Sequence, residues 1–510
     1  GGNAFDAAVA VAAALAVVEP YSSGLGGGGF WLLHTAAGRD VMVDGRERAP
    51  LAADRTLYQD EQGNVIPGLS MNGPLAAGIP GEPAALAHIA RDYGRLPLAK
   101  SLAPAIRHAR DGFEVTPHYR RMAGFRREVL LESEAAARTF LADDEVPPLG
   151  HVVRQPDLAE TLRTLAEKQG ASFYRGELAK RLVDGVRAAG GIWSREDLAA
   201  YEVVEREPVR SRYRGLELVS ATPPSSGGVA LATMLNILSG YDLADLEPAA
   251  RVHLTVEAMR RAYRDRAEYL GDPDFVDVPV ERLTHPHYAA GLRASINQDR
   301  ATPSADLPAF GAGGADTTHF SVLDGEGNYV AATLSINYPF GSGFMVEGTG
   351  VLLNDEMDDF SAKPGVPNAY GLVGAAANAI EPGKRMLSSM SPTFLRGDDR
   401  TAVFGTPGGS RIITMVLLGG LEFAAGGGAE AMVRRPRFHH QYLPDTVFYE
   451  PEALDPEVRE ALRGMGHRLE ASHRPYGNMQ AVVWDRAAGR VEAASDPRGE
   501  GAAAVFATGE

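Results

Sequence analysis

The sequence contains no cysteine, and this absence excludes several kinds of chemistry at once. Its 510 residues include 13 methionines but not one thiol. Disulfide bonds, thiolate zinc sites and a cysteine nucleophile are therefore excluded. The redox compartment stays open, because cysteine-free proteins occur on both sides of a membrane.

The sequence also lacks an excess of basic residues. Its formal net charge is −16, with 45% hydrophobic and 23% charged residues. This composition is typical of a soluble globular protein and argues against a nucleic-acid partner, whose phosphates need a basic surface. Because single hydrophobic cores usually stop growing at about 250–300 residues, we expect two lobes or one very large layered domain, with chemistry on small molecules.

No hydrophobic run is long enough to cross a bilayer. The most apolar stretch, 7–18, has twelve residues and lies between Asp6 and Glu19, whereas a spanning helix needs about 20. We interpret it as a buried helix. The chain opens abruptly at Gly1, so we expect that a preceding strand and any export signal lie outside this sequence.

Common hydrolase and nucleotide-binding motifs are missing as well. The sequence has no G-x-S-x-G, S-x-x-K, H-E-x-x-H or phosphate-loop motif. The glycine run 26–29 lacks the lysine and hydroxyl of a phosphate loop. We expect it to let two backbones approach closely beside a buried strand.

A boundary between a linker and a hairpin is the first positive signal. Residues 296–316 are rich in glycine, proline and small residues without hydrophobic periodicity, which predicts an exposed, flexible linker. Directly after it, 319–323 and 329–334 flank a turn and alternate as the two strands of a hairpin. Thr317 lies where the linker meets the first strand. Threonine is common at strand starts, so this position alone indicates no chemistry.

Polar groups that follow the hairpin are candidates for a site around Thr317. Ser335 and Asn337 end the partner strand, and an acidic set follows at 354–360. A serine-rich segment lies at 387–392. The glycine-rich turn 405–411 leads from a strand into a helix, so its free N–H groups are able to hold an anion.

Ten motifs in order then carry a specific resemblance over nearly the whole chain. They are GGNAFDAAVA, LGGGGF, GRERAP, PPSSGG, EYLGDPDF, TTHFS, NDEMDDFSAKPGVPNAYGL, KRMLSSMSPT, GTPGGSRII and RFHHQYLPD. In this order they resemble the γ-glutamyltransferase family of N-terminal-nucleophile hydrolases. The resemblance implies an α+β fold built as a four-layer αββα sandwich, with no metal or organic cofactor. It also implies self-cleavage into a large subunit, 1–316, and a small catalytic subunit, 317–510.

The resemblance assigns catalytic roles to four positions. Thr317 matches the residue that serves as nucleophile in both autoprocessing and catalysis. Cleavage before it frees an α-amine with a pKa near ~8, which can act as a local general base. Ser335 matches a position that is usually threonine and contacts this amine, so we expect a slightly looser orientation here. Gly408 and Gly409 match the backbone N–H pair of the oxyanion hole.

Substrate-binding roles follow from the same resemblance. A γ-glutamyl group is a zwitterion and needs donors for its α-carboxylate and acceptors for its α-ammonium. The matching positions are Arg46, Ser388 and Ser389 for the carboxylate, and Asn337, Glu356 and Asp359 for the ammonium. Tyr370 matches the residue of a lid that closes over the substrate in some members. We interpret His319, Phe320, His439 and His440 as structural.

The predicted activity is cleavage of the γ-glutamyl amide bond of glutathione and related compounds, with water or an amino acid or peptide as acceptor. One alternative is a glutaryl-amide or cephalosporin-type acylase on the same fold. Retention of both Glu356 and Asp359 favours a substrate that carries an amine. Another alternative is an inactive γ-glutamyl-binding protein. Location in a periplasm or outside the cell is implied by the resemblance alone, and the preference for hydrolysis or transfer stays open.

Overall fold

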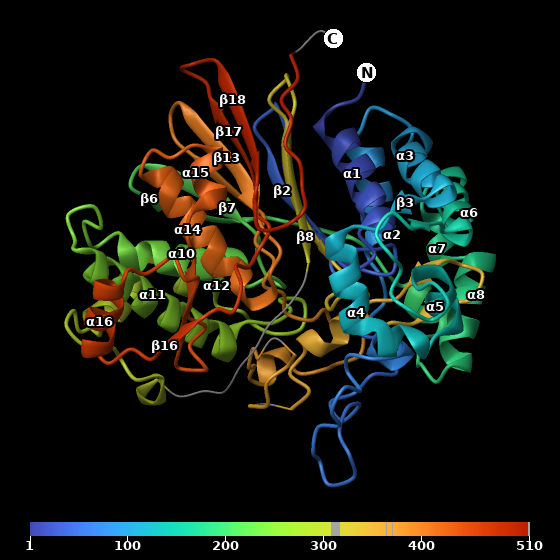
Figure 1. The fold of residues 1–510 in the computed structure, drawn as a ribbon, viewed down its shortest axis with the longest axis horizontal. Helices are drawn as coiled ribbons and strands as arrows, with labels where there is room; N and C mark the ends of the chain where they lie inside the picture. Colours follow the sequence, from blue (N-terminus) through green and yellow to red (C-terminus); the bar gives the residue numbers. More distant parts are fainter. Residues whose placement is uncertain (308–316, 364, 370, 508–510) are drawn as a thin grey trace.

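Two β-sheets lie face to face at the centre of the computed structural model (Figure 1), which describes residues 1–307, 317–363, 365–369 and 371–507. The first sheet has the strand order β5 (Val204–Arg206), β2 (Asp40–Gly45), β1 (Gly28–His34), β9 (Tyr329–Ser335) and β8 (Thr318–Leu323). The second has the order β18 (Arg490–Ser495), β17 (Gln480–Asp485), β13 (Arg400–Gly405), β12 (Thr393–Arg396), β7 (Leu216–Ser220) and β6 (Val209–Tyr213). Neighbouring strands in both sheets are antiparallel.

The first sheet is buried on both faces, as the alternation along β1 shows. Phe30 and Leu32 join a core that includes the second sheet. Trp31 and Leu33, which point to the opposite face, join a different core with the N-terminal helices. This sheet is therefore an interior layer.

Helices cover the outer face of each sheet, and Figure 1 shows the two groups on opposite sides. The first sheet packs on α1 (Ala4–Val18), α2 (Glu82–Asp92), α3 (Leu98–Asp111), α6 (Pro156–Glu167), α7 (Ala171–Tyr174), α8 (Glu177–Ala188) and α9 (Arg195–Ala199). The second packs on α10 (Gly227–Leu238), α11 (Pro248–Tyr269), α12 (Val280–Leu283), α13 (Pro286–Ala294), α14 (Ile412–Ala424), α15 (Ala429–Arg434) and α16 (Pro456–Gly464). The predicted four-layer αββα sandwich is confirmed.

Shorter elements complete the described chain. A small separate core holds α4 (Pro117–Leu131), α5 (Glu134–Phe140), β3 (Phe113–Glu114), β4 (Val152–Val153), β10 (Met345–Val346) and β11 (Val351–Leu352). A three-stranded sheet contains β14 (Phe438–His439), β15 (Val447–Tyr449) and β16 (Leu469–Ala471). Single 3₁₀ turns are η1 (Pro74–Ala76), η2 (Ser304–Asp306), η3 (Glu356–Asp359), η4 (Ala376–Asn378) and η5 (Gly409–Arg411).

The glycine run 26–29 performs the predicted spacing role. A Cβ atom on Gly27 would lie 2.2 Å from the carbonyl oxygen of Ser335, and one on Gly28 would lie 2.3 Å from that of Gly45. Side chains at these positions would push β1 away from both neighbouring strands. The glycines thus allow β9 to end close to the start of β1.

The apolar run 7–18 forms most of α1, and the helix begins with a capping box between Asn3 and Asp6. It is buried, as predicted. Among the described residues, no helix has both the length and the apolar character needed to cross a membrane.

The predicted linker differs from expectation over its first part. Ser304 is only 1% exposed, because its hydroxyl donates to the carbonyl of Tyr442 at 2.6 Å and accepts from Arg260 at 2.5 Å. Ala301 is also buried, and its N–H donates to the carbonyl of Met465. Small polar residues without periodicity therefore pack here against long-range partners. Residues 308–316 lie outside the described part of the chain.

Candidate functional site

Thr317 lies immediately before β8, and the hairpin brings it to the end of β9. Its Oγ1 atom is 3.5 Å from Oγ of Ser335, and both residues are buried. The N–H of Asn337 donates to the Ser335 hydroxyl at 2.7 Å. Antiparallel pairing of β8 with β9 therefore places together two hydroxyls that are 18 residues apart.

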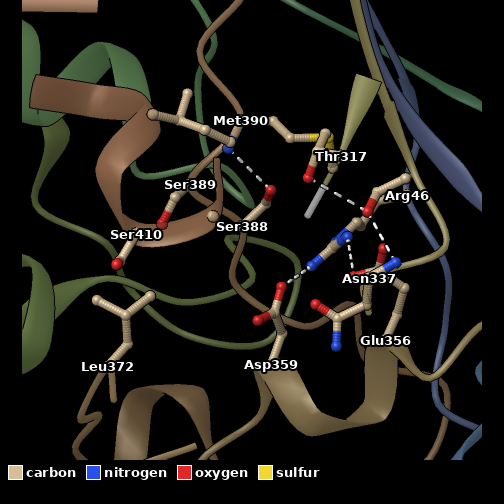
Figure 2. A pocket seen from close by; sticks show the side chains of 13 residues that line it. Arg46, Thr317, Asn337, Glu356, Asp359, Leu372, Ser388, Ser389, Met390 and Ser410 are labelled. Carbon is tan, nitrogen blue, oxygen red and sulfur yellow. Dashed lines mark hydrogen bonds and ion pairs between the residues drawn. The ribbon is translucent and has the colours of Figure 1, made fainter. Parts of the chain in front are cut away.

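A small pocket of about 270 Å³ opens beside this hydroxyl pair (Figure 2). It brings together predicted site residues from six separate segments of the chain. Its lining contains Arg46, Thr317, Ser335, Asn337, Glu356, Asp359, Ser388, Ser389 and Gly409, with Leu372, Met390, Ser410 and Ile412 completing the wall.

Arg46 is the charged centre of the pocket, and Figure 2 shows its guanidinium between two carboxylates. Nη1 donates to Oε2 of Glu356 and Nη2 donates to Oδ2 of Asp359, each at 2.5 Å. Nε donates to the carbonyl of Met386 at 3.2 Å. Arg46 directly follows β2 and is completely buried. Burial lowers the pKa of Arg46, but the two carboxylates more than offset this effect and keep it above its ordinary value.

The carboxylates of the pocket hold their protons more tightly than usual. Burial, followed by other charges, raises the pKa of Glu356 to about 7, although Arg46 opposes the rise. Burial raises the pKa of Asp359 as well, with Arg46 and Arg266 opposing it. The neighbouring Glu47 is also buried, and burial together with Glu356 raises its pKa well above the ordinary value. A pocket with several buried acids favours a ligand group that carries positive charge, because such a group stabilises the charged carboxylates.

Asn337 is held in an uncommon backbone conformation beside these acids. Its φ angle is +72°, a region that asparagine tolerates better than most residues. Its side-chain Nδ2 donates to the carbonyl of Asp355 at 3.0 Å. The same turn directs its N–H to Ser335, so Asn337 links the hydroxyl pair to the acidic segment.

Two residues that the sequence did not identify support the serine segment. The carbonyl of Ser388 accepts from both the N–H and the hydroxyl of Ser226, at 2.8 and 2.7 Å. The Ser389 hydroxyl accepts from Nη2 of Arg266 at 3.2 Å, and Nε of Arg266 donates to Ser226 at 2.9 Å. Ser226 belongs to the motif PPSSGG, and Arg266 lies two residues before EYLGDPDF; neither motif had an assigned role.

Arg266 places a second buried positive charge behind the pocket, next to Ser389 of its lining. It is 4% exposed, and burial lowers its pKa to about 10. Its guanidinium donates to the hydroxyls of Ser226 and Ser389, and among the described residues it forms no ion pair within 4.0 Å. Asp359 is close enough to raise the pKa of Arg266 in part.

Gly408 and Gly409 form the turn between β13 and α14. Their φ angles are +137° and +50°, which side-chain-bearing residues rarely adopt. A Cβ on Gly408 would also lie 2.5 Å from Cε of Met415. Among the described residues, neither N–H donates to another protein group. The pair therefore fits an anion-binding turn beside Thr317.

The remaining predictions concern a lid residue and four structural residues. Tyr370 lies outside the described residues. His319 packs against Gly405 and bonds to Thr333, and burial lowers its pKa to about 3. His439 and His440 are buried as well, and their ring nitrogens contact Thr414, Gln441 and Asp445.

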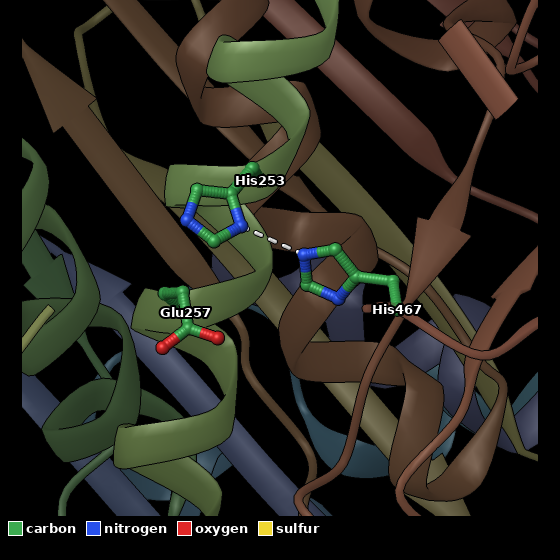
Figure 3. A group of neighbouring side chains, drawn as sticks. All are labelled: His253, Glu257 and His467. Atoms are coloured by element: carbon green, nitrogen blue, oxygen red, sulfur yellow. Dashed lines mark hydrogen bonds between the residues drawn. The ribbon is translucent and has the colours of Figure 1, made fainter. Parts of the chain in front are cut away.

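One cluster outside the pocket has residues of metal-binding type (Figure 3). Nδ1 of His253 lies 2.7 Å from Nε2 of His467, and Glu257 lies one turn further along α11. Glu257 already binds Arg261 and Thr302, each at 2.6 Å. The cluster is thus an internal network that fastens the first part of the predicted linker to α11.

The chain resembles known proteins along nearly its whole length. The family model for gamma-glutamyltranspeptidase matches residues 1–506. The chain is 44% identical to the "Glutathione hydrolase proenzyme" of Pseudomonas sp. (strain A14), over 95% of this chain and 85% of the relative. It is 42% identical to the protein of the same name from Escherichia coli (strain K12), over 98% of this chain and 87% of that protein. The crystal structure of cephalosporin acylase from Bacillus halodurans superimposes with a TM-score of 0.86 at 30% identity, covering 98% of this chain and 90% of that one. The predicted resemblance is confirmed, and the chain belongs to the γ-glutamyltranspeptidase family.

Proposed function

We propose that the chain is the precursor of a γ-glutamyltransferase that also acts as a glutathione hydrolase. It cuts itself before Thr317 into a large subunit, 1–316, and a small subunit, 317–510, which remain together as a heterodimer. The observation that carries the proposal is the Thr317–Ser335 hydroxyl pair at a pocket whose charged residues are Arg46, Glu356 and Asp359. Export to a periplasm or the cell exterior belongs to the same proposal.

In the proposed reaction the Thr317 hydroxyl attacks the γ-carbonyl carbon of the substrate. The α-amine freed by self-cleavage takes the hydroxyl proton, and Ser335 orients that amine. The N–H groups of Gly408 and Gly409 stabilise the oxyanion; removal of one such donor costs about 2.7–4 kcal/mol in related acyl transfers. The amine then protonates the leaving nitrogen, and water or an acceptor amine resolves the γ-glutamyl ester.

Recognition of the γ-glutamyl group rests on paired charges. The guanidinium of Arg46 and the hydroxyls of Ser388 and Ser389 are donors for the α-carboxylate. Glu356 and Asp359 accept from the α-ammonium, with Asn337 beside them. In the absence of substrate, Arg46 forms an ion pair with each of the two acids. The entering zwitterion brings one charge of each sign, so it can share these ion pairs without adding net charge to a buried site.

A glutaryl-amide acylase is the second candidate, because a cephalosporin acylase has the same fold over 98% of this chain. A glutaryl group carries no α-ammonium. Burying Glu356 and Asp359 together would then leave two acids facing an anionic substrate, which is costly. The acidic pair therefore favours the amine-bearing substrate.

The proposal is tested with Thr317→Ala and Thr317→Ser variants. On a denaturing gel the native protein and Thr317→Ser should give fragments of 316 and 194 residues. Thr317→Ala should stay a single band, and a split Thr317→Ala chain would refute the assigned nucleophile.

Activity distinguishes the candidates. The native protein should hydrolyse γ-glutamyl-p-nitroanilide at least tenfold faster than glutaryl-p-nitroanilide. The reverse preference would identify an acylase, and an uncut chain without turnover would indicate a binding protein.

A further inference from the structure

A second and much larger cavity also reaches the nucleophile. This groove, of about 2710 Å³, is lined by Thr317 and Gly408 but not by Arg46, Glu356 or Asp359. Thr317 thus lies at the junction of a small charged pocket and a wide open groove. An amide substrate has an acyl half and an amine half, and the pocket accounts for the acyl half alone.

Arg411 lies where its side chain can contact the amine half of the substrate. It is the third residue after Gly408, at the end of η5, and its side chain lines the groove. Its guanidinium lies over the ring of Tyr476, 4.4 Å from the centroid, and 5.7 Å from that of Phe448. Stacking of this kind fixes the plane of a guanidinium while leaving its N–H groups at the edge for a ligand.

The N–H groups of Arg411 form no ion pair with a neighbouring acid among the described residues. Among the described residues, its guanidinium forms no hydrogen bond and no ion pair within 4.0 Å. Arg498, which lines the same groove, is paired with Glu450 at 2.7 Å, and Arg434 is paired with Glu430. Arg121 and Arg474 also line the groove, but neither is stacked on an aromatic ring among the described residues.

Three of the five acids that line the groove accept hydrogen bonds from other groups of the protein. Glu450 accepts from Arg498 and from the N–H of Arg437. Glu500 accepts from the Thr116 hydroxyl at 2.9 Å and from the N–H of His118 at 3.2 Å. A carboxylate ligand at Arg411 therefore meets a donor that is oriented and available.

We propose that Arg411 determines specificity for the amine half of the substrate by binding the carboxylate of that half in the groove. The ligand class is an amino acid or short peptide with a free C-terminal carboxylate, as leaving group or as acceptor. This inference rests on the proposed function and adds the recognition of the second substrate half.

The transfer step that follows binding at Arg411 needs only the groups that are already described. In transfer, the acceptor nitrogen attacks the γ-carbonyl carbon of the threonine ester. The C–N bond forms, the bond from that carbon to Oγ1 of Thr317 breaks, and the proton of the attacking amine returns to Oγ1 through the α-amine. No oxidant or reductant is needed. Because Arg411 belongs to the turn that carries Gly408 and Gly409, a carboxylate held by it has a fixed position relative to the oxyanion donors.

The test uses two γ-glutamyl dipeptides that differ only at the C-terminus, one a free acid and the other an amide. The native enzyme should prefer the acid in kcat/KM. In Arg411→Gln the ratio of acid to amide should fall about tenfold, whereas Arg411→Lys, which keeps the charge, should retain most of it. Arg490→Gln, an exposed arginine on β18 outside the groove, controls for the loss of one positive charge.

Each ratio is measured within a single preparation, so partial folding or incomplete cleavage does not affect it. An unchanged ratio in Arg411→Gln, or a native enzyme that treats acid and amide alike, would overturn the inference while leaving the proposed function intact. Failure of the native enzyme to cleave either peptide, with turnover of glutaryl amides, would instead refute the proposed function.

Discussion

Oγ1 of Thr317 lies 3.5 Å from Oγ of Ser335, and the N–H of Asn337 fixes the serine hydroxyl from the other side at 2.7 Å. The serine is thus oriented by the backbone of the turn that follows β9. A threonine at this position would keep this hydroxyl and add a methyl group that restricts its rotamer.

Ser335→Ala should lower kcat/KM for γ-glutamyl-p-nitroanilide about two- to twelvefold, the effect of losing one hydrogen bond worth roughly 0.5–1.5 kcal/mol. Ser335→Thr should match or exceed the native rate, since it keeps the hydroxyl and stiffens the side chain. Steady-state kinetics on fully cleaved protein checks both. Equal rates in Ser335→Ala and the native enzyme would show that this hydroxyl does not orient the nucleophile.

Arg266→Gln should raise KM for γ-glutamyl-p-nitroanilide about tenfold with a smaller effect on kcat. The variant removes a buried positive charge and the bonds that hold Ser226 and Ser389. 4-Aminobutyryl-p-nitroanilide lacks the α-carboxylate, so its kcat/KM should be much less sensitive. Arg266→Lys should recover part of the loss. Equal losses on both substrates would mean that Arg266 supports the fold alone.

The dependence of kcat/KM on pH should reveal the ionisation of the Glu356 carboxyl. Because burial raises its pKa to about 7, the carboxyl is neutral below that pH and charged above it, and only the charged form balances the substrate ammonium. The α-amine of Thr317 must also be neutral, with an ordinary pKa near ~8. Log kcat/KM of the native enzyme should therefore fall with a slope approaching two below pH 7. In Glu356→Gln the slope should be one. A native slope of one would contradict this assignment.

The hairpin and the order of motifs made much of the site predictable. Alternation and turn residues predict β8 and β9, and antiparallel pairing then places Ser335 near Thr317. These are local patterns, and local patterns are what a sequence reveals directly.

The electrostatic partners were not predictable in the same way. Arg46 meets Glu356 and Asp359 across more than 300 residues of chain, and Arg266 meets Ser389 across 123. No local periodicity encodes such pairs, because they depend on how the layers stack. The burial of Ser304 was missed for the same reason, since its partners Arg260 and Tyr442 come from distant segments.

Glu82, at the start of α2, should make the folded state progressively less stable as the pH rises from about 4 to 8. It is 1% exposed, neither carboxylate oxygen has a hydrogen-bond partner among the described residues, and burial raises its pKa to about 8. The unfolded chain ionises it near ~4.3. Burial of Glu82 therefore costs no folding stability below about pH 4.3. The cost grows between about pH 4.3 and 8 by up to about 1.4 kcal/mol per pH unit, and it is constant above pH 8.

Glu82→Gln removes this titration and should raise Tm by several degrees at pH 8 but little at pH 4.5. Scanning calorimetry at both pH values checks this, with the exposed Glu167→Gln as control. The same gain in Tm at both pH values would show that the neutral side chain stabilises the fold by packing and that titration of Glu82 plays no part.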